Sequence, residues 1–345
     1  MGNKKHLLVI RLSAMGDVSM TVPVLKSLLD SYPNIKITVL TKEFLKPIFE
    51  GLDNVSIHVA DVKGRHRGIN GLWKLYKELK TLRINAVADL HNVLRTNVLK
   101  QFFRLNGIPF VQIDKGRIEK KALSREKNKV LVPLRTTHQR YVDVFDKLGY
   151  PFSLPEANFI RKKELSDKAL EIVGRNSMKW LGIAPFAAFS GKMYPLDLMQ
   201  KVIQQLNNTG KYKIFMFGGG NKEKEILKAW ENKYQDCVNI IGKLSFDDEL
   251  AIISNLDLML SMDSGNAHLA AMFGIPTITL WGVTHPYAGF YPYGQDPDNA
   301  LLSDRNVYPL IPTSIYGNKF PKGYEIVMET IDPDLVLDKV NQLLN

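Results

Sequence analysis

Short apolar runs alternate with longer amphipathic segments along most of the first half of the chain. The amphipathic segments repeat their apolar positions with helical spacing, whereas the apolar runs are too short for helices and are typical of buried strands. We expect strands at residues 7–10, 36–40, 55–59, 86–89 and 110–113, and helices at 18–30, 44–50, 69–82, 95–105 and 137–148. This order predicts a parallel sheet with helices on both faces.

The alternation stops at residues 151–161, an extended stretch that contains proline, and it starts again near residue 180. A short helix is expected between them, at 165–173. Beyond it we expect strands at 180–185, 213–217, 239–241, 256–260 and 277–281, and helices at 196–207, 222–231, 246–253, 268–273 and 333–344. Residues 283–325 are rich in Pro, Gly and Tyr and are expected to be mostly loop.

The predicted fold class is therefore α/β, with two Rossmann-like, doubly wound domains. The expected bounds are 1–160 for an N-terminal domain, 161–178 for a linker, 179–330 for a C-terminal domain and 331–345 for a final helix. Ligands of such sheets bind at the carboxyl ends of the strands. Two domains that face each other would hold a ligand in the cleft between them.

Composition narrows the class of protein. Hydrophobic residues make up 45% of the 345 residues, which is enough to build sizeable cores. Cys237 is the single cysteine, so a disulfide framework is excluded and a cysteine-based zinc site is disfavoured. Apolar runs in the sequence stay far below the roughly 18 residues that span a bilayer. We therefore expect a cytoplasmic protein.

The net charge of +11 is concentrated in one part of the chain. Residues 61–150 hold 20 Lys and Arg against 8 Asp and Glu, a net of +12. Such a field attracts nucleic acid, anionic lipid or a phosphorylated substrate, although a well-solvated surface is an equal alternative. The aromatic residues of this stretch lie in helical patterns typical of core, and we find neither an RNA-binding aromatic motif nor a helix-turn-helix signature.

Phosphate binding is suggested by the segment Asp263-Ser-Gly-Asn-Ala-His268. It follows the predicted strand at 256–260 and leads into the predicted helix at 268–273. The first N–H groups of a helix have no intrahelical partner, and they attract anions. Gly265 lets a ligand approach the backbone closely. The structural alternative is that Asp263 or Ser264 is an ordinary N-cap.

A second candidate turn, Arg11-Leu-Ser-Ala-Met-Gly-Asp17, follows the first strand. Its glycine leaves room for a substrate, and the carboxylate of Asp17 can take a proton from an attacking hydroxyl group. On this motif alone, a purely structural role for Asp17 as a helix cap is favoured. The turn lacks a G-x-G-x-x-G fingerprint, so it gives little support to a dinucleotide site.

Two loops of the second half could contact a ligand. Lys192 follows the strand at 180–185 and could neutralise a diphosphate group, although on this motif alone an exposed loop lysine is the favoured interpretation. Gly218-Gly-Gly220 ends the strand at 213–217 and could border a nucleotide or form a flexible turn.

Four segments, taken in order, resemble glycosyltransferase family 9. They are R-L-S-A-M-G-D-V at 11–18, K-M-Y-P at 192–195, F-G-G-G at 217–220 and D-S-G-N-A-H-L-A-A-M-F-G-I-P at 263–276. The resemblance covers nearly the whole chain. It implies the GT-B fold, in which the active site lies between two Rossmann-like domains, and an inverting transfer of heptose from ADP-heptose to the inner core of lipopolysaccharide.

The resemblance also implies roles for individual residues. Asp17 matches the proposed general base, and Lys192 matches the lysine that contacts the donor phosphate. Further donor-binding residues would be Ser190, Gly218, Gly219, Asp263, Ser264, Gly265 and His268. We assign acceptor binding to Arg11, Ser13, Lys120, Lys121 and Arg125. Phe186, Ala187 and Ala188 depart from the family pattern in the loop before Lys192, and Ser190 is the remaining hydroxyl that could touch phosphate there.

We expect no metal and no cofactor, because the two D-x-D matches, Asp296–Asp298 and Asp332–Asp334, do not follow a predicted strand. The expected partners are a nucleotide sugar, a lipid-linked oligosaccharide acceptor and the inner face of the cytoplasmic membrane as a peripheral surface. Three alternatives stay open. A sugar-nucleotide epimerase would need further acid–base carboxylates, a nucleic-acid-binding protein would leave the D-S-G segment unexplained, and a catalytically inactive sugar-nucleotide binder would bind donor without turnover.

Overall fold

The computed structural model describes residues 5–174 and 177–344 and divides the chain into two compact units. The first unit contains the residues up to Lys115 together with Thr137–Ile160, and the second contains Gly116–Thr136 together with the residues from Arg161 onward. The sequence pattern predicts that all of 1–160 forms one domain. The segment Gly116–Thr136 instead clusters with the second unit, where Lys129 donates to the carbonyl oxygen of Pro312 and the N–H of Leu134 donates to the carbonyl oxygen of Tyr287. Residues 175 and 176 of the expected linker lie outside the described residues.

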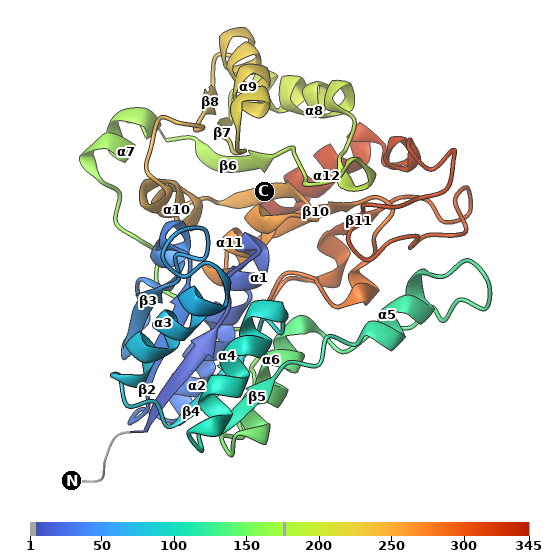
Figure 1. Ribbon diagram of the computed structural model, residues 1–345. Coiled ribbons are helices and arrows are strands. Elements are labelled where there is room, and N and C mark those ends of the chain that lie inside the picture. The colour runs from blue at the N-terminus through green and yellow to red at the C-terminus, as the bar shows by residue number, and fades with distance from the viewer. Residues whose placement is uncertain (1–4, 175–176, 345) are drawn as a thin grey trace. The chain divides into compact units, whose positions relative to one another are not determined.

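The first unit is built on a parallel sheet. Its described strands are β1 (His6–Ile10), β2 (Lys36–Thr41), β3 (Val55–Val59), β4 (Ala86–Asp89) and β5 (Phe110–Gln112), and Figure 1 shows them with their helices. They pair in the order β3-β2-β1-β4-β5. The strand order reverses between β1 and β4, and the carboxyl ends of two such strands are where doubly wound sheets bind ligands.

Helices cover this first sheet as predicted from the amphipathic segments. They are α1 (Met15–Ser19), α2 (Thr21–Ser31), η1 (Glu43–Phe49), α3 (Gly68–Lys80), α4 (Leu94–Leu105) and α6 (Thr137–Lys147). Tyr76 of α3 and Phe103 of α4 pack in one buried cluster with Leu8 and Ile10 of β1. The single helix expected at 18–30 is two helices, since α1 ends at Ser19 and α2 begins at Thr21. Pro23 lies in the first turn of α2, where its missing N–H group costs no intrahelical hydrogen bond.

The second unit holds a larger parallel sheet, with six strands in its described part and the order β11-β10-β9-β6-β7-β8. The strands are β6 (Lys179–Ala184), β7 (Tyr212–Met216), β8 (Cys237–Asn239), β9 (Leu258–Met262), β10 (Thr277–Trp281) and β11 (Ala300–Leu302). The strand expected at 239–241 lies two residues earlier, at β8. Strand β11 was not predicted, because it lies in the region expected to be loop.

The helices of the second unit include one that the sequence analysis missed, α5 (Arg117–Ser124). The others are α7 (Asp167–Val173), η2 (Ser190–Lys192), α8 (Leu196–Asn208), α9 (Asn221–Lys233), α10 (Phe246–Ser254), α11 (Gly265–Met272), η3 (Pro286–Ala288), η4 (Pro297–Asn299), η5 (Val327–Thr330) and α12 (Pro333–Leu344). Across residues 5–174 and 177–344, no helix combines the length and apolar character that crossing a bilayer requires.

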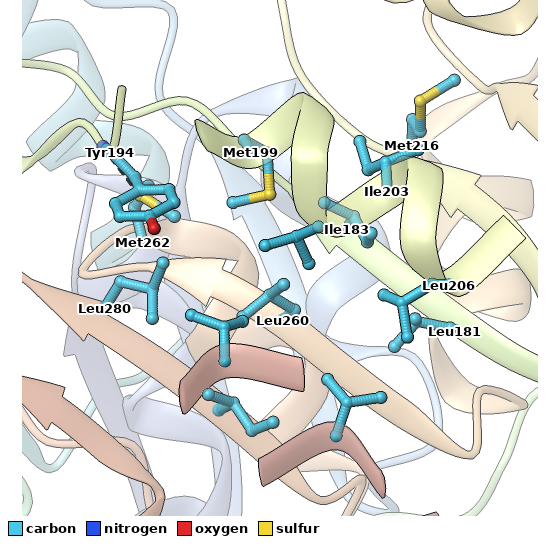
Figure 2. Close-up of a cluster of buried hydrophobic side chains, with 14 of the residues drawn as sticks. Leu181, Ile183, Tyr194, Met199, Ile203, Leu206, Met216, Leu260, Met262 and Leu280 are labelled. Carbon is cyan, nitrogen blue, oxygen red and sulfur yellow. Dashed lines mark hydrogen bonds between the residues drawn. The ribbon is translucent and has the colours of Figure 1, made fainter. Parts of the chain in front are cut away.

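Helix α8 closes one face of the second sheet. Figure 2 shows Met199, Ile203 and Leu206 of α8 beside Leu181 and Ile183 of β6, and all five side chains are buried. Full burial of each such side chain contributes about 1.5–3 kcal/mol. This packing fixes β6, and with it the start of the loop that carries Lys192.

Candidate active site

The turn after β1 brings Arg11 and Asp17 into contact. Arg11 is buried, and its Nη2 lies 2.5 Å from Oδ2 of Asp17. Its Nη1 donates a 2.6 Å hydrogen bond to the carbonyl oxygen of Leu90, which follows β4. The guanidinium therefore connects the carboxyl ends of β1 and β4, and it holds the Asp17 carboxylate at the switch point of the sheet.

Asp17 is the third residue of α1 and not its N-cap. Its Oδ2 accepts a weak hydrogen bond of 3.3 Å from the backbone N–H of Ala14, which is the N-cap. Asp17 therefore contributes to capping α1 from its first turn, and not as the N-cap residue considered from the sequence. The Asp17 side chain is 26% exposed, so a hydroxyl group can approach a carboxylate that Arg11 has already oriented.

Tyr141 of α6 stabilises the turn after β1. Its hydroxyl group donates to the carbonyl oxygen of Asp17 at 3.2 Å, and its ring lies 6.0 Å from the guanidinium carbon of Arg11. Burial raises the pKa of Tyr141, so the phenol stays protonated and remains a donor. Sequence reasoning missed Tyr141, because it lies 124 residues away from the residue it supports.

His91, which follows β4, lies next to the predicted acceptor residue Ser13. The Ser13 Oγ and the His91 Nε2 are 3.4 Å apart. Burial, together with the charges of Arg11 and Lys115, lowers the pKa of His91 to about 3, so the ring is neutral at physiological pH. The only sequence signal for His91 was its place directly after the predicted strand at 86–89.

In the second unit, the predicted donor residues Lys192 and Asp263 form an ion pair. The Lys192 Nζ lies 3.1 Å from Oδ2 of Asp263, and the Thr284 hydroxyl donates to the same oxygen at 2.9 Å. Both charged side chains are largely buried, at 15% and 9% exposure. Asp263 therefore anchors the lysine and does not cap a helix, and Thr284 is a further member of the site that the sequence did not indicate.

Helix α11 begins beside this ion pair. Ser264 is its N-cap by backbone geometry, but the Ser264 hydroxyl bonds to that of Ser261 at 3.0 Å and not to the first turn. The side-chain cap considered from the sequence is therefore not formed. Gly265 is the first residue of the helix, and His268 is buried within it. A helix start of this kind offers backbone N–H groups to an anion.

The glycine turn after β7 is ordered by Glu223 of α9, which sequence reasoning missed. The Glu223 Oε2 accepts a 2.7 Å hydrogen bond from the N–H of Gly219. A Cβ atom on Gly218 would lie 2.8 Å from the same oxygen and 3.0 Å from Phe186, so both side chains would have to shift to admit it. The hydrogen bond ties the turn to α9, and Phe186, one of the departures from the family pattern, is buried beside it.

The remaining predicted residues have mixed surroundings. Ser190 is exposed in η2, and Lys121 and Arg125 are exposed in or just after α5. Lys120 is buried, with its Nζ 4.1 Å from the ring centre of Phe290, so it is less accessible than Lys121 and Arg125. Lys120, Lys121 and Arg125 all belong to the second unit, whereas Arg11 and Ser13 belong to the first.

The two D-x-D matches have structural roles at helix starts. Asp296 is the N-cap of η4, and its side chain accepts from the N–H of Asp298 at 2.9 Å. Asp332 lies directly before α12, and its side chain accepts a 2.9 Å hydrogen bond from the N–H of Asp334 in the first turn of that helix.

Comparison with known proteins identifies the family. Residues 72–310 match the model of glycosyltransferase family 9 (heptosyltransferase). The chain is 28% identical to lipooligosaccharide heptosyltransferase 2 of Haemophilus influenzae, with 98% of this chain and 99% of the relative covered. It is 25% identical to lipopolysaccharide heptosyltransferase 2 of Escherichia coli, with 98% of both chains covered.

Solved structures agree on the fold. A family 9 glycosyltransferase from Veillonella parvula superposes with a TM-score of 0.74 at 21% identity, covering 99% of this chain and 98% of that one. The ADP-heptose lipopolysaccharide heptosyltransferase II of E. coli gives 0.70 at 21% identity, with 98% of both chains covered. The predicted fold and family are thus confirmed: the chain belongs to glycosyltransferase family 9 and is a glycosyltransferase with the GT-B fold.

Proposed function

We propose that this enzyme transfers heptose from ADP-heptose to a sugar of the lipopolysaccharide inner core, with inversion at the anomeric carbon. The observation that carries the proposal is the buried Lys192–Asp263 pair beside the start of α11 in a member of family 9. The relatives that match along nearly the full chain are named as lipopolysaccharide and lipooligosaccharide heptosyltransferases. The E. coli heptosyltransferase WaaC has been solved with ADP and with ADP-2-deoxy-2-fluoro heptose.

The donor diphosphate would be held by Lys192 and by the first N–H groups of α11. An ammonium and a helix start each stabilise the charge that builds up on a departing diphosphate. Asp263 keeps the lysine in place through a 3.1 Å contact. Ser190, Gly218, Gly219 and His268 would line the remainder of the donor site.

Asp17 would be the general base of the transfer. It accepts the proton of an acceptor hydroxyl as that oxygen forms a bond to the anomeric carbon of the heptose. The bond from this carbon to the diphosphate oxygen breaks on the opposite side, and ADP leaves with the electron pair. A single displacement of this kind inverts the anomeric configuration. Arg11 and Tyr141 hold the turn that positions the carboxylate.

The acceptor would be a lipid-linked, phosphorylated oligosaccharide at the inner face of the cytoplasmic membrane. Support comes from the net charge of +12 over residues 61–150. Within this stretch, residues 116–136 carry 7 Lys and Arg against 2 Glu. Because Lys120 is buried, the proposal for this segment rests on the exposed Lys121 and Arg125.

The test is turnover with ADP-heptose and a deacylated lipopolysaccharide core acceptor, with the product anomer assigned by NMR. Asp17→Asn should lower kcat by about 10²–10⁴-fold, because the amide has no basic site. The affinity for ADP should stay near wild type. The asparagine oxygen can still accept from Ala14, but it no longer neutralises the buried Arg11, so the melting temperature should fall while the variant remains folded. Product analysis would also detect an epimerised sugar nucleotide.

A matched control comes from α2 in the same unit. Asp30 pairs with Lys26 at 3.0 Å on the helix surface, so Asp30→Asn removes a paired carboxylate without touching the turn after β1. It should turn over like wild type. Normal turnover of a folded Asp17→Asn variant would exclude Asp17 as the base, and no heptose transfer by the wild-type enzyme to any core acceptor would exclude the proposed reaction.

A further inference from the structure

The loop at residues 313–320, which we name the strap, packs on the side chain of Lys192. An irregular segment connects β11 to the strap, which includes Ser314, Gly317 and Phe320. Gly317 is buried and has a φ of +80°. A methyl group on Gly317 would overlap Cγ of Lys192 and lie 2.7 Å from its Cδ. The α-carbon of Gly317 is therefore in close contact with the aliphatic stem of the lysine.

The strap is held firmly where it meets the lysine. The Ser314 hydroxyl accepts hydrogen bonds from the N–H groups of Tyr316 and Gly317 at 3.3 and 3.0 Å. The Ser314 hydroxyl also bonds to Oδ1 of Asn318 at 3.1 Å. This turn fixes the positive φ of Gly317, and with it the surface that Lys192 meets.

The strap and the Lys192 loop are also joined through the chain after β10. The N–H of Val283 donates to the carbonyl oxygen of Gly191 at 2.8 Å, and the N–H of Thr313 donates to the carbonyl oxygen of Val283 at 3.0 Å. A side chain on Gly191 would lie 2.7 Å from the carbonyl oxygen of Gly317 and 2.9 Å from Phe320. Three loops thus cross at separations that leave no room for a side chain.

We infer that Gly317 is a positioning residue for donor binding, which sets the path of the Lys192 side chain and so the place of its ammonium group. A lysine stem has many rotamers, and holding it in one of them costs conformational entropy. Contact with the strap removes most of these rotamers before the donor arrives, which preorganises the cation for the diphosphate. This inference rests on the proposed contact between Lys192 and the donor.

The test is a double-mutant cycle measured by calorimetry with ADP. Lys192→Ala should weaken ADP binding about 10- to 100-fold, the scale of a charge-assisted contact. Gly317→Ala should weaken it about fivefold or more, because the new methyl group displaces the stem. In the Lys192→Ala background the clashing Cγ and Cδ atoms are gone, so adding Gly317→Ala should change the affinity for ADP no further.

Gly323 supplies the control for backbone strain. It has a φ of +89°, and a methyl group there would meet no atom within 4 Å. Gly323→Ala should therefore lower the melting temperature but leave the affinity for ADP at the wild-type value. With the full reaction, Gly317→Ala should raise the KM for the donor more than it lowers kcat, whereas a general loss of folded enzyme would lower only the apparent kcat.

The outcomes separate the two proposals. Unchanged ADP affinity in Lys192→Ala would overturn both the donor contact and the role of Gly317. Wild-type affinity in Gly317→Ala, or an equal loss with and without Lys192, would overturn the role of Gly317 alone. If Gly317→Ala does not fold, Ser314→Ala replaces it, because it releases the turn without adding an atom. It should weaken ADP binding only when Lys192 is present, and any other result overturns the inference.

Discussion

Glu249 is a carboxylic acid in an unfavourable place on α10. Its side chain is mostly buried, and desolvation raises its pKa from 4.5 to about 7. Between these two pH values the folded protein binds more protons at Glu249 than the unfolded chain does. Stability therefore falls as the pH rises from 4.5 to 7, and the full cost of ionising the buried group remains at higher pH.

Replacing Glu249 with glutamine should remove this cost. We expect Glu249→Gln to stabilise the protein at pH 8 by about 1–3 kcal/mol, the order of magnitude that corresponds to a rise in pKa from 4.5 to about 7. At pH 4.5 the variant and wild type should have similar stability, because the glutamate is then largely neutral. Thermal unfolding at the two pH values measures the effect.

Glu225 on α9 is the control for this experiment, because it is exposed. Glu225→Gln removes the same charge from the surface and should leave the difference between the two pH values at its wild-type size. An equal gain for Glu249→Gln at pH 4.5 and pH 8 would mean that the burial of a charge is not the cause.

The residues of the candidate site were only partly predictable from the sequence. Asp17, Lys192 and Asp263 lie in short motifs at strand ends, where local pattern and chemistry agree. Thr284 and Glu223 were missed because their roles depend on partners in other segments of the chain. Lys120 was assigned to the acceptor because its charge is visible in the sequence, whereas its contact with Phe290, 170 residues later, is not.

Helix α5 is the element that departs most from expectation. Its sequence R-I-E-K-K-A-L-S is only eight residues long and mostly polar, so it was not recognised as a helix despite its amphipathic spacing. Contacts made elsewhere in the second unit stabilise the segment. The ammonium of Lys129 donates to the carbonyl oxygen of Leu123 at 3.1 Å and to the carbonyl oxygen of Pro312 at 2.6 Å. The backbone N–H of Leu134 donates to the carbonyl oxygen of Tyr287 at 2.9 Å.

The difference between local pattern and tertiary contacts also explains which strands could be predicted from the sequence. The buried strands of both sheets are short apolar runs, and the alternation with helices locates them to within a few residues. Strand β11 is three residues long and exists through its pairing with β10, which places Leu280 opposite Leu301. Pairing of this kind depends on the tertiary fold and leaves no periodic signal in the sequence.

One exposed face of α5 combines charge with an apolar side chain. Ile118 is 87% exposed, and Lys121 and Arg125 follow it by three and seven residues. The three-residue spacing places Ile118 and Lys121 on one side of α5, and Arg125 is the exposed residue that follows the helix. A cationic helix face with an exposed apolar residue suits the surface of an anionic bilayer.

Reversing two charges on this face tests the proposed contact with the membrane. Lys121→Glu/Arg125→Glu should lower binding to phosphatidylglycerol vesicles about tenfold or more, since each basic residue near such a surface contributes about 1 kcal/mol. Wild-type binding should also weaken as salt rises. Co-sedimentation measures both, and Lys201→Glu/Lys228→Glu, the same charge change on α8 and α9, should bind nearly as wild type. An equal loss of vesicle binding in both variants would mean that binding depends on the net charge of the protein and not on this face of α5.

At the scale of the whole molecule, the proposed chemistry is divided between the two units. The residues proposed to bind the donor belong to the second unit, and the proposed base and its supporting residues belong to the first. The chain passes between units more than once, because residues 116–136 join the second unit before α6 returns to the first. The sequence pattern suggested two domains but gave no sign of this excursion, because the contacts of Lys129 with Pro312 and of Leu134 with Tyr287 are long-range.

This division predicts how ADP changes local stability. A ligand that binds only the folded state stabilises it by RT ln(1 + [L]/Kd), about 2.7 kcal/mol at a hundredfold excess over Kd. Hydrogen exchange with ADP should therefore slow by about a hundredfold in the most protected amides of β6, β9 and α11. The amides of β1, β2 and β4 should exchange at the rate seen without ADP, because compact units can open independently. In Lys192→Ala the slowing should largely disappear at the same ADP concentration. Equal slowing in both sheets would show that the two units unfold as one cooperative structure, or that ADP is held by both.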